Sequence, residues 1–244
     1  DTYLTAFFEG DADGGAHERE ARSAHDWDQI LTLPRRLTLR NDHDLDIEPA
    51  GAIESLRFDH RHIGRTVLPP NEERVLEEIG GTCIELKIEA DAKFASMLEV
   101  NVLRSAHKEE FTRICFYGRR GFKYREPFPD DVRSRYVMST ALSNPVRYES
   151  VITIDTSYSS TLPDAISRPP ESAPVEIAPD ESVQLRVFVD RSVVEVFVNG
   201  RQCVAVRVYP GRQDSRGVSL LSRGRESTVH SVDCWQMKSI YERE

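Results

Sequence analysis

Apolar and polar residues alternate along much of this chain, with a period of two that is typical of β-strands with one buried face. Residues 83–90, CIELKIEA, show it most simply, because the apolar residues fall on one face and Glu85, Lys87 and Glu89 fall on the other. The same alternation runs through three more segments, residues 30–39, 111–117 and 147–154. We therefore predict a strand at each of these places.

The clearest local prediction is an antiparallel meander of three strands over residues 185–209. Apolar residues, mostly valine, occupy every second position of each strand, and residues 190–192 (Asp-Arg-Ser) predict the first turn. Asn199 and Gly200 predict the second turn, since both tolerate the positive φ that a two-residue hairpin turn requires.

Helical periodicity is weak throughout. Residues 71–79, NEERVLEEI, fit two turns of helix capped by Asn71, and they fit equally well an acidic loop that leads into the strand at Cys83. Residues 161–180 hold five prolines, which predicts an irregular surface segment. Many short strands with so little helix indicate an all-β fold, either a sandwich or a barrel.

Composition narrows the range of partners. The chain has 244 residues, with 32 Lys and Arg against 41 Asp and Glu, and a net charge of -9. An acidic surface without a basic stripe does not suit phosphate backbones, so we expect no nucleic-acid partner. No apolar run reaches the length that crosses a bilayer, so we expect no membrane partner. The chain begins at Asp1, and we expect it to be a piece of a longer precursor.

The cysteines are spread widely, and none belongs to a C-x-x-C pair, which argues against a zinc knuckle. They are Cys83, Cys115, Cys203 and Cys234. Each lies in an apolar, strand-like run, where a free buried thiol is common. One or two disulfides stay open for a secreted parent.

Three stretches resemble the family 32 glycoside hydrolases, which include invertases, inulinases and levanases. They are residues 27–39 (WDQILTLPRRLTL), residues 185–210 (with Asp-Arg-Ser, Glu-Val-Phe and Arg-Val-Tyr-Pro) and residues 234–239 (CWQMKS). The resemblance implies a two-sheet antiparallel β-sandwich, of the jelly-roll or concanavalin-like kind, over residues 30–244. Residues 1–29 would be the remnant of the last strand of a catalytic propeller, followed by an acidic linker.

The resemblance also implies a role. The family's propeller carries its nucleophilic Asp in Trp-Met-Asn-Asp-Pro-Asn, a stabilising Asp in Arg-Asp-Pro and an acid/base Glu beside a Cys, and none of these motifs occurs here. We therefore expect no catalytic, cofactor-binding or metal-binding residue in this chain. It would be the C-terminal structural and oligomerisation domain of a β-fructofuranosidase-like enzyme that hydrolyses sucrose or fructans, and it would be inactive alone.

Several partners and alternatives follow from this interpretation. The catalytic propeller would be the main partner, with a second copy of the chain or a fructan as further candidates, and an extracellular location is favoured over others. If residues 3–9 are a propeller remnant, one flank should expose apolar residues, with Leu31 and Leu33 at its border. The alternatives are a free-standing carbohydrate-binding module and a small hydrolase that uses unrecognised carboxylates.

Two carboxylate pairs are candidates for that hydrolase. Glu89 and Asp91 are two positions apart on a predicted strand, and Asp190 and Glu195 flank a predicted turn. A retaining glycosidase needs its two carboxyl groups about 5–5.5 Å apart. Acidic residues on the polar face of a strand are usually solvated, so we predict no catalytic pair and interpret Glu195 as a charge-paired exterior residue.

Two segments have the residue types of metal sites. Residues 9–20 nearly match a calcium-binding loop, but Glu9 stands where that loop requires Asp, which favours an exposed acidic loop. His60 and His62 share one face of a strand at a spacing that can bind zinc. No third ligand is evident near them, and we interpret them as surface histidines.

Overall fold

The computed structural model describes residues 2–4, 7–8, 30–41, 44–92, 95, 97–123, 147–163, 165, 168–178 and 180–240, with the backbone alone for 2–4, 7–8, 119–123 and 147–149. Within these residues the one helical element is a single 3-10 turn, η1 (Ile53–Leu56), and all other regular elements are strands. No described helix has the length and apolarity needed to cross a membrane. The prediction of an all-β fold is confirmed.

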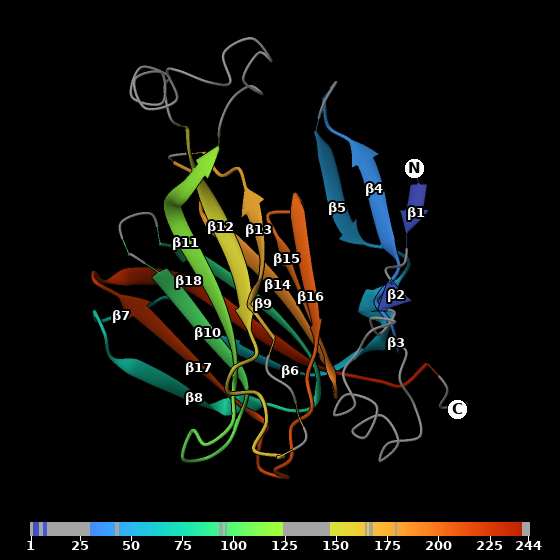
Figure 1. The fold of residues 1–244 in the computed structure, drawn as a ribbon, viewed down its shortest axis with the longest axis vertical. Helices are drawn as coiled ribbons and strands as arrows, with labels where there is room; N and C mark the ends of the chain where they lie inside the picture. Colours follow the sequence, from blue (N-terminus) through green and yellow to red (C-terminus); the bar gives the residue numbers. More distant parts are fainter. Residues whose placement is uncertain are drawn as a thin grey trace, which may run out of the picture.

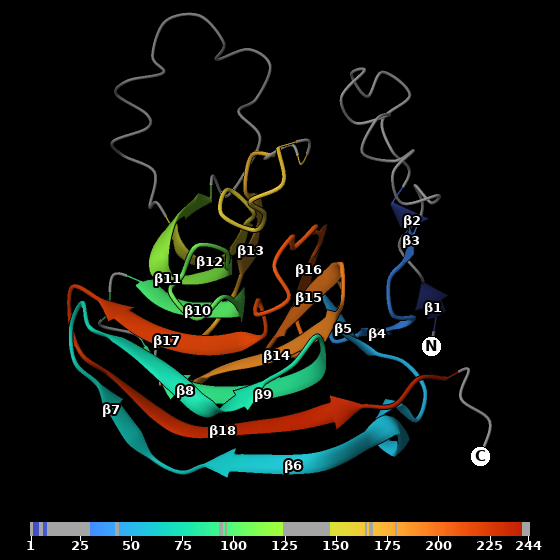
Figure 2. The ribbon, with the colours of Figure 1, turned by 90° about the horizontal axis from the view of Figure 1, so that it is seen from below.

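Two antiparallel sheets stacked face to face form a sandwich (Figures 1 and 2). The seven-stranded sheet has the order β16-β15-β14-β9-β18-β6, with β7 also paired to β18. Its strands are β6 (Arg57–Ile63), β7 (Thr66–Leu68), β9 (Cys83–Asp91), β14 (Val183–Asp190), β15 (Val193–Val198), β16 (Gln202–Arg207) and β18 (Ser227–Met237).

The six-stranded sheet has the order β13-β12-β11-β10-β17-β8. Its strands are β8 (Glu73–Gly80), β10 (Met97–Arg104), β11 (Thr112–Lys123), β12 (Arg147–Asp155), β13 (Glu171–Val175) and β17 (Gly217–Arg223). The two sheets together confirm the predicted two-layer sandwich.

Short strands at the N-terminal end lie beside the sandwich, next to β15 and β16 (Figure 1). β1 (Thr2–Leu4), β4 (Arg35–Leu39) and β5 (Leu45–Pro49) form a three-stranded sheet, and β2 (Phe7–Phe8) pairs with β3 (Ile30–Leu31). We call the segment from β3 through β5 the N-terminal strap. The strand predicted over residues 30–39 is therefore two strands, interrupted just before β4 at Pro34, which has no N–H to donate. The proposed domain boundary at residue 30 stays a prediction.

One hydrophobic core fills the space between the two sheets, as the alternating pattern predicts. The valines of the meander point into it, and Val187, Val194, Val196 and Val198 are all fully buried. The apolar face of β9 and the apolar residues of β10, β11, β12 and β17 meet them from both sheets. Burying each such side chain stabilises the fold by about 1.5–3 kcal/mol relative to leaving it exposed. All four cysteines are free thiols.

Both interpretations of residues 71–79, the helix and the acidic loop, are wrong, because most of this segment lies in the strand β8. Leu76 and Ile79 are both buried although they lie three positions apart, a spacing typical of a helix. A bulge explains it, since the register with β17 shifts between the pairs Ser219–Val75 and Gly217–Gly80. The extra residues of β8 return Ile79 to the core face.

The proline-rich segment is only partly irregular, because five of its residues form β13. This strand lies at the end of the six-stranded sheet, where it pairs only with β12. An edge strand has one side free of ladder hydrogen bonds, so Pro174 can occupy it despite lacking an N–H.

The predicted Asn199-Gly200 turn is confirmed in its backbone conformation, with φ of 49° and 64°. The Arg201 N–H closes the turn on the Val198 carbonyl at 2.9 Å. The loop, however, has three residues rather than the predicted two, because Val198 pairs with Gln202 across the ladder.

Candidate functional site

Charged side chains gather on the outer face of the seven-stranded sheet, the face that points away from the core. Side chains alternate between the two faces of a strand, so the neighbours of core residues emerge here. The charged residues come from β6, β9, β14, β15 and β18, and they are Arg57, Glu85, Lys87, Arg186, Glu195 and Asp233. Two of the carboxylates, Glu85 and Glu195, are buried. A buried carboxylate is costly unless it is ion-paired and hydrogen-bonded.

Glu85 of β9 is fully buried, and two arginines neutralise it. Arg57 of β6 forms a bidentate pair, with Nη2 2.7 Å from Oε1 and Nε 2.8 Å from Oε2. Arg186 of β14 donates a third bond, from Nε to Oε1 at 2.6 Å. The hydrogen bond to Glu85 raises the pKa of Arg57. The alternation in the sequence correctly places Glu85 on the polar face of its strand, but nothing in the local sequence predicts that the side chain is buried.

Glu195 of β15 is also buried, at 3% exposure, and the N-terminal strap covers it. Its Oε1 accepts the Leu33 N–H at 2.7 Å, and its Oε2 accepts from Arg35 Nη2 at 3.2 Å. Burial raises the pKa of Glu195, and the Leu33 hydrogen bond and the Arg35 charge offset this only in part. The predicted charge pairing is confirmed, whereas the predicted exterior position is wrong. A covered carboxylate of this kind has no route to a bound sugar.

A small apolar cluster fixes the strap to the same face. Phe188 and Phe197 meet edge to face, with ring centroids 5.9 Å apart. Residues of the strap, among them Leu33 and Ile47, pack against these rings. The Ile47 N–H also donates to the carbonyl of Gly200 at 2.6 Å, at the hairpin turn between β15 and β16. The strap therefore binds the sheet through an ion pair, backbone hydrogen bonds and apolar contact together.

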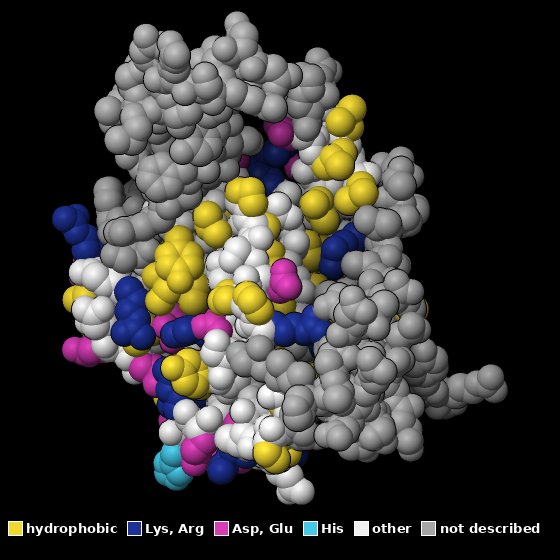
Figure 3. All heavy atoms as spheres, viewed as in Figure 1, with side chains coloured by type: hydrophobic (Ala, Val, Ile, Leu, Met, Phe, Trp, Pro, Cys, Tyr) yellow, Lys and Arg dark blue, Asp and Glu magenta, His cyan; other side chains and the backbone are white. Residues whose placement is uncertain are grey.

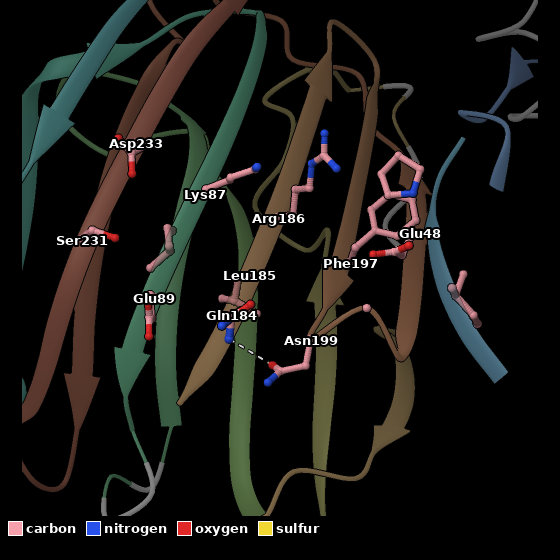
Figure 4. Close-up of a pocket in the computed structure, with 14 residues that line it drawn as sticks. Glu48, Lys87, Glu89, Gln184, Leu185, Arg186, Phe197, Asn199, Ser231 and Asp233 are labelled. Atoms are coloured by element: carbon pink, nitrogen blue, oxygen red, sulfur yellow. Dashed lines mark hydrogen bonds between the residues drawn. The ribbon is translucent and has the colours of Figure 1, made fainter. Parts of the chain in front are cut away.

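A pocket of about 350 Å³ opens on the outer face beside β5 (Figure 4). Its charged lining residues carry both signs, and they are Glu48, Lys87, Glu89, Arg186 and Asp233. The one aromatic residue in the lining, Phe197, is 2% exposed, so it offers no open ring face for a sugar to stack on. The pocket therefore offers charged and hydrogen-bonding side chains but no exposed aromatic face.

Three of the four predicted carboxylate candidates have hydrogen-bond partners within the fold. Glu89 accepts a hydrogen bond from Ser182 Oγ at 2.8 Å, a structural contact. Asp190 and Glu195 are diagonal neighbours across the β14–β15 ladder, because Asp190 pairs with Val193 and Glu195 pairs with Phe188. The charge of Asp190 adds to the rise in the pKa of Glu195. Asp190 also accepts from the Cys83 thiol at 3.6 Å. The calcium-like segment 9–20 lies outside the described residues.

His60 and His62 do have a third polar neighbour, which the sequence interpretation missed. Asp233 of β18 contacts both imidazole rings. It follows His62 by 171 positions, so only the pairing of β6 with β18 brings the three together.

Two more carboxylates with strong structural roles lie away from the outer face, and no sequence pattern singled them out. Glu110 is fully buried and accepts the N–H groups of Thr161, Gly211 and Arg212, together with the Ser215 hydroxyl at 2.6 Å. Burial raises the pKa of Glu110, but these hydrogen bonds outweigh it and the net shift is downward.

Glu73 of β8 is the second such carboxylate. Burial raises its pKa, but hydrogen bonds from Arg104, Ser219 and Lys108 overcome this and lower the value to about 2. A carboxylate so firmly ionised cannot serve as a general acid.

Comparison with known proteins connects this fold to one family. Residues 52–236 match the family model described as "Glycosyl hydrolases family 32 C terminal". Among curated proteins, the chain is 25% identical over 232 residues to acid beta-fructofuranosidase 4, vacuolar, of Arabidopsis thaliana, covering 88% of this chain and 34% of that protein. It is 25% identical over 219 residues to the levanase of Bacillus subtilis, covering 88% and 28%. The chain thus spans about a third or less of these relatives.

Solved structures show the same fold. Fructan 1-exohydrolase IIa from Cichorium intybus superimposes with a TM-score of 0.73 at 18% identity, over 97% of this chain and 45% of that one. Exo-inulinase from Aspergillus awamori superimposes with a TM-score of 0.59 at 19% identity, over 87% and 37%. In each case the likeness covers less than half of the larger protein.

Proposed function

Because the chain belongs to glycosyl hydrolase family 32, as the C-terminal domain, we propose that it serves as the docking domain for a catalytic propeller. The whole protein would hydrolyse terminal β-fructosyl bonds of sucrose or fructans, which accords with the names of the relatives. The described carboxylates support a non-catalytic role for this domain, since Glu85 and Glu195 are buried in ion pairs and Glu73 stays ionised.

The observation that best supports a docking role is a group of exposed leucines on the N-terminal strap. Leu39 and Leu45 are directly opposite one another on β4 and β5, and they are 65% and 44% exposed. Leu31 of β3 is 65% exposed as well. Figure 3 shows hydrophobic side chains along the β4–β5 hairpin. An apolar cross-strand pair left in water on an otherwise charged protein marks a contact surface.

Leu31, expected at the border of an apolar flank, is one of these exposed leucines, whereas Leu33 turns inward to the cluster around Phe197. The side chains of residues 3–9, the expected propeller remnant, lie outside the described residues. The strap would present its leucines to the propeller while the Glu195–Arg35 pair holds it on the sandwich.

A binding experiment tests the docking role. The region encoded ahead of Asp1 would be produced as a separate polypeptide and mixed with the chain, and complex formation would be followed by size-exclusion chromatography and calorimetry. We expect a complex that the double variant Leu39→Lys/Leu45→Lys weakens at least tenfold. Val67→Lys is the matched control, because Val67 is 49% exposed on β7, away from the strap.

Two outcomes would contradict the proposal. One is a complex that tolerates the leucine double variant as well as it tolerates the Val67 control. The other is an upstream region that encodes no propeller, combined with retention of the chain on immobilised inulin or levan. That second result would favour a free-standing carbohydrate-binding module.

A further inference from the structure

One group of polar side chains on the outer face takes no part in holding the strap or the buried carboxylates. His60 and His62 lie on β6, and Asp233 lies on the neighbouring strand β18. His60 Nε2 is 2.7 Å from Asp233 Oδ1, and His62 Nδ1 is 2.8 Å from the same oxygen. One nitrogen or oxygen from each residue falls within 4.8 Å of the other two.

The strand register explains this convergence. His62 and Asp233 are direct partners across the ladder, so their side chains emerge side by side. His60 lies two positions away on the same face of β6, beside a bulge where Asp59 adopts a φ of 45°. The His60 ring stacks on Trp235, with centroids 4.7 Å apart and planes 9° from parallel. The ring is therefore already held near Asp233.

Two imidazole nitrogens and one carboxylate oxygen form a donor set that suits Zn²⁺. Tetrahedral zinc holds its ligands about 2.0–2.2 Å from the ion, which places them roughly 3.3 Å from one another. The two observed contacts are shorter than this, so the side chains would have to open by about half an ångström to admit the ion. They are free to do so, because the side chains of His60 and His62 are 47% and 54% exposed.

We propose that His60, His62 and Asp233 form a Zn²⁺ site with three protein ligands and a fourth position open to water. The histidines come from β6, the outermost strand of the seven-stranded sheet, and the aspartate comes from the strand inside it. A bound ion would clip this edge strand to β18. The proposal departs from the expectation from sequence of a chain without metal ligands, since Asp233 joins the two histidines only in the fold.

Zinc titration of chelator-treated protein tests the site. Calorimetry should show one Zn²⁺ bound per chain through these ligands, and Zn²⁺ should raise the melting temperature. Mg²⁺ and Ca²⁺ at the same concentrations should not, because they prefer oxygen ligands. The site depends on no catalytic domain, so its test is separate from that of propeller docking.

Three variants locate the ion. His60→Gln and His62→Asn place an amide near the Nε2 and Nδ1 positions and so retain a hydrogen bond to Asp233, yet they should weaken Zn²⁺ binding at least tenfold. His230→Asn is the matched control, an exposed histidine elsewhere on β18, and should bind as the wild type does.

Melting in the presence of EDTA shows that each variant is folded, and the two histidine variants test the site independently. The proposal fails if the wild type binds no Zn²⁺ up to millimolar concentration. It also fails if His60→Gln and His62→Asn bind the ion as tightly as His230→Asn does, because the ion would then be held elsewhere.

Discussion

The backbone N–H of Leu33 donates a hydrogen bond of 2.7 Å to the carboxylate of Glu195, which lies 162 positions later in the chain. This contact joins the strap to β15, the strand next to the edge of the seven-stranded sheet, and Arg35 adds an ion pair to the same carboxylate. The local alternation places the Glu195 side chain on the outer face of β15, and the distant strap covers that face and buries the carboxylate.

We first predict the cost of breaking that contact. Glu195→Ala should lower the free energy of unfolding by about 3 kcal/mol, because it leaves the Arg35 side chain, 13% exposed, without its counter-ion. Glu195→Gln also removes the counter-ion of Arg35, but it keeps an oxygen that can accept the Leu33 N–H, so it should cost less than the alanine variant, by about 1 kcal/mol. Urea unfolding followed by circular dichroism measures both. Equal stability of the alanine variant and the wild type would show that the strap is not held through Glu195.

A second prediction concerns acid stability and Glu73. Its pKa of about 2 lies below the ordinary value of 4.5, so its contribution to folding is complete above pH 4.5 and declines as the pH falls toward 2. The shift corresponds to at most about 3 kcal/mol. Urea melts between pH 6 and 3 should therefore show a steeper loss of stability in the wild type than in Glu73→Gln.

The control for this experiment lies on the same strand. Glu77 is exposed, so Glu77→Gln should leave the acid dependence unchanged. A Glu73→Gln variant with the wild-type slope would mean that Arg104, Lys108 and Ser219 do not hold the carboxylate ionised in the folded protein.

The third prediction concerns the hairpin at Gly200. Gly200→Val should destabilise the fold by about 1–2 kcal/mol, because a β-branched residue is strained at a φ of 64°. A steric clash is not the cause, since an added Cβ would meet the Glu48 side chain at an ordinary 3.7 Å. Gly200→Asn should recover most of the loss, since asparagine tolerates this conformation. Thermal melts of both variants check it, and identical losses would point to the Glu48 contact instead.

A fourth prediction concerns activity. The purified chain should release no fructose from sucrose or inulin, because its buried carboxylates are ion-paired and the catalytic motifs of the family are absent from its sequence. Sugar analysis after prolonged incubation is the measurement. Turnover that follows the protein through purification and disappears with Glu89→Gln or Asp91→Asn would identify a hydrolase with unrecognised carboxylates.

Much of the fold is readable from the sequence because its strands follow a strict alternation. The meander of β14, β15 and β16 and the apolar face of β9 were predicted correctly for this reason. β8 was not, because a bulge against β17 gives Leu76 and Ile79 the spacing of a helix. Bulges depend on the partner strand, and no local pattern reports them.

The candidate sites were much harder to predict. In the sequence Glu85 and Glu110 look like ordinary surface acids, because the residues that donate hydrogen bonds to them lie on strands and loops elsewhere in the chain. Asp233 joins His60 and His62 only through the pairing of β18 with β6. Alternation tells which face of a strand a residue occupies, whereas ligand sets and buried ion pairs depend on which strands become neighbours.

The strap lies outside the region that the family model matches, although it contacts that region closely. The family match begins at residue 52, whereas the contacts of Leu33, Arg35 and Ile47 with the sheet lie before it. A gene fusion that joined the matched region alone to a new enzyme would uncover Phe197 and leave the Glu195 carboxylate without its partners. The contacts that complete the outer face of the sheet therefore extend beyond the region that the family model matches.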